Sequence, residues 1–579
     1  MLKTFSFSYL SLFCVSFVGG ANLTLEVAHE ADENPLVLED IRYTASDGTA
    51  YGVARLSYLL SDFDLRTKDG EWIGMPEWYA WMDVGEGRQE VVLPNIPPRL
   101  YQKIRFNLGL APKANHSDPT QYDAEHPLNS NLNQLHWTWK DGYIFMALEG
   151  HYDQDGENAG FVYHLANDWN LVPVEFEVEI DLNGNAALEL VLDVERIMSS
   201  TQPLSFEMDG DSTHAGVDDP LAAKLKANLS KAFRVSKVTS ASEKVSVAMR
   251  QPIDKPSTFT PYHLPLGYGF PIPKIPADNP LFVERIELGE KLFFDKILSA
   301  DKTISCADCH NPELGFSDPN RLSSGINGSK TRRHSMALIN LAWKDSFFWD
   351  GRVKTLREQV VHPITDPAEM GADLDVLVEK LKESDDYVEA FGKAFASGEI
   401  SVLNLSLALE NYLLTLTSNR SRFDLSRKKK LELTEQEKRG FELFMMENEP
   451  RNERFGADCF HCHGGALFTD HAFHDNGLDI LEDLGRMEAT GRRSDKGKFV
   501  TPTLRNVELT APYMHDGRFG TLEEVVAHYN APMERRATLD SNLAKHPKEG
   551  LNLSADDQAA LVAFLKALTE VPVEVNETK

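Results

Sequence analysis

Four cysteines lie in two pentapeptides whose spacing is typical of covalent haem attachment. The pentapeptides are Cys306-Ala-Asp-Cys309-His310 and Cys459-Phe-His-Cys462-His463. In such a motif the two thiols add to the vinyl groups of one haem, and the adjacent histidine supplies the proximal nitrogen ligand. A redox dithiol or half of a zinc site would explain a single pair. Because the two motifs use every cysteine except Cys14, we expect two covalent c-type haems, with His310 and His463 as ligands to iron.

Similar sequences flank both motifs. Gly289-Glu-Lys-Leu292-Phe293 and Gly315-Phe316-Ser317-Asp318 enclose the first, and Gly440-Phe-Glu-Leu443-Phe444 and Leu467-Phe468-Thr469-Asp470 enclose the second. A helix before each attachment loop and an aromatic turn after it predict two mainly α-helical cytochrome c modules in tandem. Apolar residues spaced three and four apart predict helices over 374–396 and 402–416, and Thr434-Glu-Gln-Glu437 and Ser554 are typical of helix N-termini.

The composition limits the class of protein. A chain of 579 residues is too long for one hydrophobic core. Its 59 basic and 89 acidic residues give a net charge of −30, which argues against nucleic acid or an anionic membrane as a partner. Residues 1–20 combine Lys3 with a short apolar run and small residues, the pattern of a cleaved signal peptide. No other stretch is long and apolar enough to span a membrane, so we expect a periplasmic protein.

The part of the chain before residue 200 has a different pattern. Apolar and polar residues alternate over 23–27, 90–93, 103–107 and 175–180, and Asp-Gly turns separate such segments. Many short strands of this kind predict an all-β, sandwich-like domain. We therefore expect a multidomain protein with a β domain at 21–200, a linker at 201–265, a first haem module at 266–425 and a second at 426–579.

The haem half resembles the bacterial dihaem cytochrome c peroxidase and MauG superfamily over residues 266–570. The motifs that carry the resemblance are Phe347-Phe348-Trp349-Asp350-Gly351-Arg352, His362-Pro363-Ile364, Glu369-Met370-Gly371, Thr503-Leu504-Arg505-Asn506 and Pro512-Tyr513-Met514-His515-Asp516-Gly517. The resemblance implies that hydrogen peroxide reacts at the first haem and that the second holds electrons. It also implies that Trp349 lies between the two haems, although a large aromatic residue is also common in a core.

Peroxide cleavage needs a group that moves a proton between the two oxygens. By its position, the resemblance makes Glu369 that acid and base, with Pro363 shaping the distal pocket; a surface carboxylate is the alternative for Glu369. In the classical peroxidases a distal histidine must first leave the iron. The segment Gly325-Ile326-Asn327, where that histidine is expected, has none. We therefore expect an open pocket, as in the MauG-like branch.

The second haem needs a sixth ligand. Thr521-Leu-Glu-Glu524 predicts a helix N-terminus, and Tyr529 follows on the same apolar face as Leu522. The resemblance gives tyrosine as the ligand in MauG-like proteins, where classical peroxidases have methionine. A phenolate stabilises oxidised iron. A core role for Tyr529 remains open, as do His528 and Met514 as competing ligands.

The superfamily also holds a calcium ion between its modules. The resemblance maps two backbone oxygen ligands to Thr510 and Pro512, and places His334 where an asparagine ligand is expected. Because imidazole is a poor ligand for calcium, the presence of this ion is in doubt.

The β half resembles the MbnP family over residues 22–195. The segments that carry the resemblance are Leu135-His136-Trp137-Thr138-Trp139-Lys140-Asp141-Gly142-Tyr143-Ile144-Phe145, Leu148-Glu149-Gly150, Asn115-His116-Ser117-Asp118 and Tyr163-His164-Leu165. In separate-chain systems, an MbnH-like partner oxidises an MbnP tryptophan to kynurenine and so completes a copper site. Candidates for the modified residue are Trp137 and Trp139. Imidazole suits copper, and the candidate ligands are His29, His116, His136 and His164, each of which could instead be a solvated or hydrogen-bonded residue.

These features predict a secreted dihaem peroxidase-like enzyme that uses hydrogen peroxide to oxidise a tryptophan of its own β domain. Tethering raises the effective concentration of that substrate. A conventional cytochrome c peroxidase with a small redox-protein donor is the first alternative. A non-enzymatic copper-binding or electron-transfer protein is the second.

Overall fold

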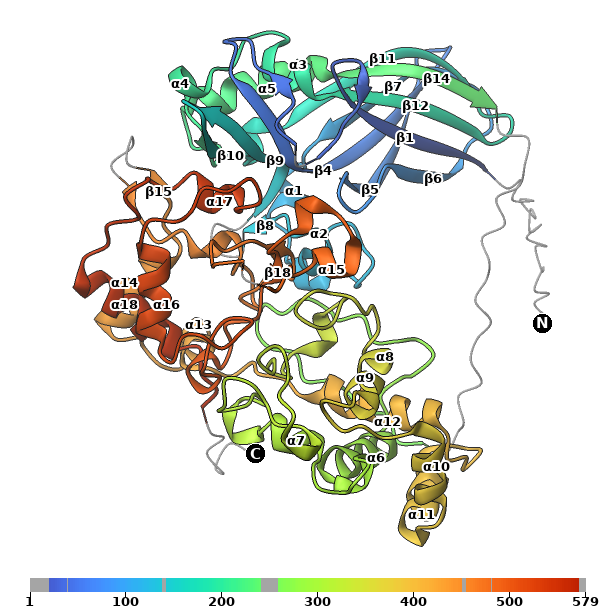
Figure 1. Cartoon of the computed structure of the whole chain (residues 1–579). Helices are drawn as coiled ribbons and strands as arrows, with labels where there is room; N and C mark the ends of the chain where they lie inside the picture. Colours follow the sequence, from blue (N-terminus) through green and yellow to red (C-terminus); the bar gives the residue numbers. More distant parts are fainter. Residues whose placement is uncertain are drawn as a thin grey trace, which may run out of the picture.

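A computed structural model describes residues 20–38, 40–137, 142–240, 259–449, 454–480 and 482–571. The predicted signal peptide, apart from Gly20, lies outside these ranges, as does Trp139. The β domain forms one end of the molecule, the first haem module forms the other, and the second haem module lies beside the β domain (Figure 1). None of the described helices has the length and apolar character needed to cross a bilayer.

Two sheets face each other in the β domain. In the smaller sheet β1 (Ala21–Ala31) pairs in parallel with β12 (Ala186–Asp193) and antiparallel with β6 (Glu90–Ile96). The larger sheet has the order β11-β7-β4-β9-β10-β13. Its strands are β3 (Tyr43–Thr44), β4 (Ala50–Thr67), β5 (Trp72–Asp83), β7 (Leu100–Leu108), β8 (His136–Trp137), β9 (Gly142–Gln154), β10 (Glu157–Ala166), β11 (Val172–Asp181) and β13 (Ser212–Thr213). Side chains along β1 alternate between the core and the surface, and Leu23, Leu25 and Val27 are completely buried. This pattern confirms the predicted sheet-rich domain.

The β domain continues past residue 200, where the sequence predicts a linker. Helix α5 (Pro220–Ala232) packs Leu225 and Leu229 into the core, and β14 (Phe233–Ser240) pairs antiparallel with β12. The side chain of Asp219 caps α5, and Pro220 occupies its first turn. The scattered serines and lysines of this segment lie on its exposed side, so composition alone concealed a helix and an edge strand.

The two haem modules repeat one helix crossing. Helix α6 (Val283–Phe294) crosses α12 (Val402–Thr415), and α14 (Glu435–Phe444) crosses α18 (Ala555–Lys566). A Cβ atom on Gly289 would lie 2.1 Å from the carbonyl oxygen of Ala408, and one on Gly440 would lie 1.9 Å from that of Ala560. The echoed glycines therefore allow two equivalent close contacts between helices, as expected of a duplication.

One predicted helix is divided. Residues 374–396 form α10 (Leu374–Lys382) and α11 (Asp385–Ala394), because the chain turns at Ser384, the N-cap of α11. The predicted N-termini at Thr434 and Ser554 are confirmed by their capping hydrogen bonds. The remaining helices used below are α7 (Cys306–Cys309), α9 (Val361–Thr365), α16 (Leu522–Asn530), α17 (Ser541–Ala544) and the short η8 (Cys459–His461).

The β domain docks on the second haem module through β9 and β10. The imidazole of His151 donates to the carbonyl oxygen of Leu539 at 2.8 Å, and Asn158 donates to the carbonyl oxygen of Arg536 at 3.2 Å. Gly160 lies so close to Ser541 on α17 that a Cβ atom would be 1.9 Å from its carbonyl oxygen. Figure 1 shows α17 directly beneath these strands.

Candidate haem sites and the interface between the domains

The first attachment motif begins as a capped helical turn. Ser305 and Asp308 form a capping box at the start of α7, which contains Cys306 and Cys309. Nδ1 of His310 donates to the carbonyl oxygen of Phe316 at 3.0 Å, and burial lowers the pKa of His310. The imidazole is thus neutral and oriented, and its Nε2 is the nitrogen available to iron.

The second motif has the same proximal arrangement. Nδ1 of His463 donates to the carbonyl oxygen of Phe468 at 3.1 Å, and burial lowers the pKa of His463 as well. Phe316 and Phe468 both have positive φ angles, 59° and 52°. The thiols of both motifs are free cysteines. Paired thiols beside an oriented neutral histidine fit a covalent c-type haem at each motif.

A cavity of about 230 Å³ adjoins the second motif. Its lining includes Cys459, Cys462 and His463, and on α16 and the loop before it Tyr529 and Met514. Asn476 donates from Nδ2 to the hydroxyl oxygen of Tyr529 at 3.4 Å and to the sulfur of Met514 at 3.5 Å. The predicted ligand and one competitor thus reach the same cavity.

His528, the other competitor, has a different place. Its Nε2 donates to the carbonyl oxygen of Asn476 at 3.0 Å, and it is not among the described residues that line the cavity. Burial raises the pKa of the Tyr529 phenol, so in the absence of iron this side chain is neutral.

Glu369 is half-buried near Cys306 and Cys309 of the first haem motif. Burial raises its pKa, the nearby Asp366 raises it further, and Arg352 opposes both effects. Ile326 donates its backbone N–H to the carbonyl oxygen of Glu369 at 2.8 Å, so the segment that lacks a distal histidine packs against this residue. Pro363, on α9, accepts from the backbone N–H of Met370 at 3.1 Å. The two predicted distal residues are therefore held on one folded loop.

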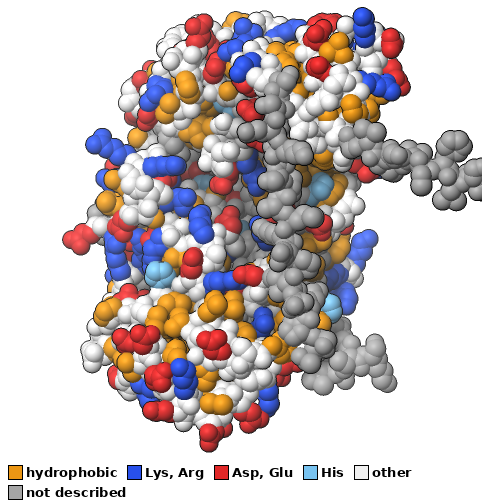
Figure 2. Space-filling view, turned by 90° about the vertical axis from the view of Figure 1, so that its right-hand side faces the viewer, with side chains coloured by type: hydrophobic (Ala, Val, Ile, Leu, Met, Phe, Trp, Pro, Cys, Tyr) orange, Lys and Arg blue, Asp and Glu red, His pale blue; other side chains and the backbone are white. Residues whose placement is uncertain are grey.

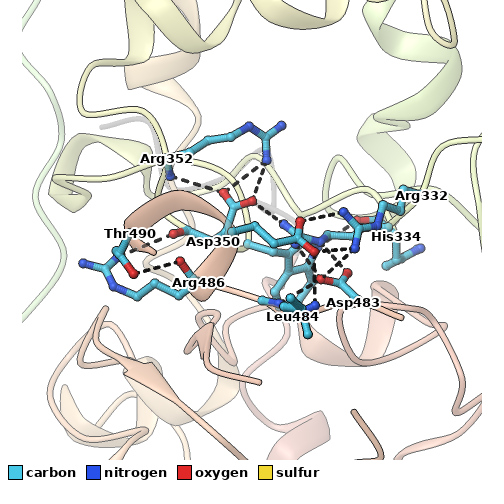
Figure 3. Close-up of polar contacts among 12 residues, drawn as sticks. Arg332, His334, Asp350, Arg352, Asp483, Leu484, Arg486 and Thr490 are labelled. Atoms are coloured by element: carbon cyan, nitrogen blue, oxygen red, sulfur yellow. Dashed lines mark hydrogen bonds and ion pairs between the residues drawn. The ribbon is translucent and has the colours of Figure 1, made fainter. Parts of the chain in front are cut away.

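Trp349 is buried between the modules and lines the cavity of the second haem. Its indole N–H donates to the carbonyl oxygen of His334 at 2.9 Å, and its own carbonyl oxygen accepts from Val500 at 2.9 Å. The next residue, Asp350, joins an ion-pair network with Arg333, which also binds Asp483 through two hydrogen bonds of 2.7 Å. Figure 3 shows Asp350 and Arg352 of the first module facing Asp483 and Arg486 of the second. This network fixes the two modules around Trp349.

His334, which stands where the resemblance expects an asparagine ligand of calcium, contacts neighbouring oxygens through both ring nitrogens. Its two ring nitrogens lie 3.1 Å from the hydroxyl of Ser317 and 3.2 Å from the carbonyl oxygen of Asn320. His334, which replaces the expected asparagine, is therefore already engaged with these neighbouring oxygens.

The four candidate copper histidines do not converge. Nε2 of His29 lies 2.9 Å from the hydroxyl of Tyr58, His116 binds the carboxylate of Asp168, and His136 packs edge-on against a tyrosine ring. Among the described residues, the close groups of potential metal ligands include His164 but none of the other three. The predicted set of four is therefore not one site.

His164 instead meets two histidines that sequence reasoning missed. Its ring centroid lies 5.1 Å from that of His214 and 5.7 Å from that of His461, and those two are 5.4 Å apart. We call these three residues the interdomain histidine cluster. His461 lies between the two cysteines of the second haem motif, and this position in the sequence could have identified it as a candidate ligand. His214 was hidden in the segment we expected to be a linker.

Trp137 is buried beside this cluster. Its ring centroid lies 5.9 Å from that of His214 and 6.4 Å from that of His164. The ring of Phe460, which stands between the two haem-attaching cysteines, lies 6.2 Å from that of His214. A series of closely spaced rings therefore joins the second haem motif to a tryptophan of the β domain.

Comparison with known proteins gives separate matches for the two halves. A family model described as di-haem cytochrome c peroxidase matches residues 283–432, and the MbnP family model matches residues 20–215. The methylamine utilization protein MauG of Methylorubrum extorquens is 37% identical over 304 residues, which cover 52% of this chain and 82% of that protein. Cytochrome c551 peroxidase of Nitrosomonas europaea is 33% identical over 309 residues, which cover 52% of this chain and 84% of that protein.

A solved structure of a MauG-like protein associated with microbial copper homeostasis is 33% identical, covers 55% of this chain and 95% of that chain, and superposes with a TM-score of 0.46. The identities to MauG and to cytochrome c551 peroxidase extend over more than four-fifths of those relatives. The chain therefore belongs to the di-haem cytochrome c peroxidase and MauG family, as a peroxidase-type oxidoreductase that has an MbnP domain at its N-terminus.

Proposed function

We propose that this enzyme uses hydrogen peroxide to oxidise Trp137 of its own N-terminal domain to kynurenine. The observation that carries the proposal is the position of the Trp137 ring, two ring-to-ring steps of 5.9 and 6.2 Å from Phe460 in the second haem motif. Short distances between aromatic rings favour electron transfer along them. Trp137 is only 4% exposed, so an external oxidant in solution has little access to it.

The residues of the first module handle protons. When bound, the two haems supply the redox chemistry that accepts oxidising equivalents from peroxide. Glu369 takes a proton from one peroxide oxygen and returns it to the other, so that one oxygen leaves as water. Its burial favours this exchange, because a carboxyl group with a raised pKa releases and recovers a proton more evenly near neutral pH.

Trp349 positions the two modules for electron transfer. It is held by hydrogen bonds at both its indole nitrogen and its carbonyl oxygen, so its ring keeps one orientation between the haem motifs. The overall reaction consumes two peroxide molecules. Together they accept four electrons and four protons from the indole and are reduced to four water molecules; two oxygen atoms from water enter the opened ring, and hydrolysis then releases formate to give kynurenine.

Mass spectrometry of the full-length protein tests this proposal. After peroxide treatment, the peptide that contains Trp137 and Trp139 should show a net loss of one carbon and gain of one oxygen. Trp137→Phe should abolish this change, while Trp139→Phe, two residues away, should retain it. A modification that persists in Trp137→Phe, or that is absent from the wild type, would contradict the proposal.

A conventional peroxidase reaction is the second candidate, and the 33% identity to a cytochrome c551 peroxidase favours it. Acidic and basic side chains lie among one another on the face drawn in Figure 2, so charge does not mark a docking site for a redox partner there. Rapid steady-state turnover with reduced cytochrome c551 and no change in the Trp137 peptide would support this candidate. A reaction that stops after a few equivalents of peroxide supports self-modification.

A further inference from the structure

The β domain contacts a stretch of irregular backbone in the second haem module. Its strands β9 and β10 meet the carbonyl oxygens of Arg536, Leu539 and Ser541. We call residues 535–541 the docking segment. Before α17 begins at Ser541, residues 535–540 form turns and one isolated β-bridge, with no helix or extended strand. Contacts with other parts of the module must therefore hold this segment in place.

The completely buried carboxylate of Asp475 makes most of these contacts. It accepts hydrogen bonds from both Nη2 and Nε of Arg536, the latter at 2.6 Å, and from the hydroxyl of Thr538 at 2.7 Å. The backbone carbonyl oxygen of Asp475 accepts from the N–H of Asp540 at 3.1 Å. A bidentate pair of guanidinium and carboxylate is strong and directional. The position of the docking segment thus depends on Asp475.

The same carboxylate fixes the residue that reaches the cavity of the second haem. Oδ1 of Asp475 accepts from the backbone N–H of Gly477 at 3.0 Å, which closes a turn around Asn476. From this turn Asn476 donates to the hydroxyl oxygen of Tyr529 and to the sulfur of Met514. One buried side chain therefore contacts the docking segment on one side and orients a donor to the predicted iron ligand on the other.

His474 ties the same two regions together a second time. Its Nδ1 lies 2.6 Å from the carboxylate of Asp540 and its Nε2 lies 2.8 Å from that of Asp470. Burial opposes a charge on this imidazole, but the two carboxylates raise its pKa well above the usual value, so both contacts are ion pairs. Asp540 also caps α17 by accepting from the N–H of Asn542 at 2.9 Å. His474 itself lines the cavity.

We propose that Asp475 is a positioning residue that couples docking of the β domain to the surroundings of Tyr529 at the second haem. If the β domain leaves, the docking segment loses the groups that fix its backbone, and Arg536 can move away. A buried carboxylate that loses its cation is strongly destabilised. Asp475 must then shift, and the turn that holds Asn476 shifts with it. The coupling goes beyond the proposed oxidation of Trp137 and does not depend on it.

Such coupling is reciprocal, because any state of the second haem that favours one position of Asn476 also favours one position of the docking segment. The second haem would therefore differ between a protein with its β domain in place and one without it. In the fused chain, the haem nearest to the β domain would be adjusted by the presence of that domain.

A matched pair of glycine variants tests the coupling from the β domain. The holoprotein, with both haems and without peroxide, is used throughout. Gly160→Val places a side chain against the carbonyl oxygen of Ser541, whereas Gly184→Val, in the same domain, points into open space. Gly160→Val should increase amide hydrogen exchange in the docking segment and change the ferric spectrum of the second haem. Gly184→Val should do neither, and the first haem should respond to neither variant.

The reduction potential of the second haem should also fall in Gly160→Val. A hydrogen bond donated to a ligand atom withdraws electron density from it, so its loss stabilises oxidised iron. We expect a change of about threefold in the redox equilibrium, which is about 28 mV at 59 mV per tenfold for one electron. Thr538→Val removes one hydrogen bond to Asp475 without altering any charge, and it should lower the potential in the same direction by less.

A double-mutant cycle distinguishes coupling through Asp475 from a merely structural role. In the Asp475→Asn background, Gly160→Val should release the docking segment but cause no further change at the second haem. Asp479→Asn, an exposed carboxylate in the same loop, is the control, and in that background the full effect of Gly160→Val should persist.

An unchanged second haem in Gly160→Val would overturn the proposal, whether or not hydrogen exchange in the docking segment increases. The full effect of Gly160→Val in the Asp475→Asn background would overturn it as well, because the coupling would then bypass Asp475. None of these measurements involves kynurenine. Failure to oxidise Trp137, with the spectral change intact, would therefore count against the proposed function alone.

Discussion

On the proximal side, the two haem modules are built alike. In both, a glycine permits a close helix crossing, a histidine follows two cysteines, and its Nδ1 donates to the carbonyl oxygen of a phenylalanine with positive φ. On the distal side they differ. The first module presents the half-buried carboxyl of Glu369, whereas the second presents Tyr529 and Met514.

This difference teaches how a duplicated module acquires separate roles. The helix crossing and the proximal hydrogen bond hold a haem, and both copies need them. We expect the distal loops to determine whether an external molecule or a side chain approaches the iron, and these loops differ between the two modules. The second module also differs because its attachment motif contacts the β domain through His461.

The largest effect is expected from removing the proton-transfer group of the first module. Glu369→Gln should slow peroxide reduction by about 10²- to 10⁴-fold, because an amide cannot exchange the proton. Stopped-flow absorbance measures the rate, and haem content should stay unchanged. Glu313→Gln, at an acidic position outside the buried core in the same module, is the control. Equal rates for Glu369→Gln and the wild type would remove Glu369 from the mechanism.

The second prediction concerns the distal side of the other module. Tyr529→Phe should change the ferric spectrum of the second haem and raise its reduction potential by on the order of 100 mV, because phenolate stabilises oxidised iron. Met514→Leu should leave both properties unchanged. Spectroelectrochemistry resolves the two haems, and the first should not respond to either variant. If Met514→Leu gives the larger shift, methionine is the ligand.

The proximal sites could be predicted because their information is local. Cys-x-x-Cys-His and the echoed glycines and phenylalanines each lie within a few residues of one another, and the structure assembles both copies in the same way. The alternation in 23–27 was similarly sufficient to predict β1. Local patterns specify local structure when no distant contact competes with them.

The interdomain histidine cluster could not be predicted in this way. His164, His214 and His461 are far apart in sequence and meet only because β10 docks on the second module. The linker assignment failed for a related reason, since β14 is stabilised by pairing with β12 and not by its own composition. From the sequence alone, His29, His116, His136 and His164 are equivalent candidates for a copper ligand. In the folded protein, tertiary packing separates the first three from His164.

A third prediction uses the raised pKa of Glu369. The base form of this carboxyl is lost as pH falls through its pKa, so the rate of peroxide reduction should decline on the acid side of a value above the ordinary 4.5, by about tenfold per pH unit. Stability has the opposite dependence on pH, because the folded state favours the protonated form of Glu369. The contribution of this group to the free energy of unfolding is therefore complete below pH 4.5 and is lost as pH rises through the raised pKa. Glu369→Gln should remove this acid limb from a pH–rate profile, and an unchanged limb would assign it to another group.

The smallest effect is expected where the modules meet at His334. Chelation by EGTA should change electron transfer between the haems by less than about twofold, because His334 binds Ser317 and Asn320, stands where the resemblance expects an asparagine ligand, and is a poor donor to calcium. His334→Asn restores an oxygen donor and should make the same rate sensitive to EGTA. Flash photolysis of the half-reduced protein measures that rate in both. Strong inhibition of the wild type by EGTA, reversed by calcium, would show that Thr510 and Pro512 hold the ion despite the histidine, and the modules would then be joined by a metal as well as by the Arg333 network.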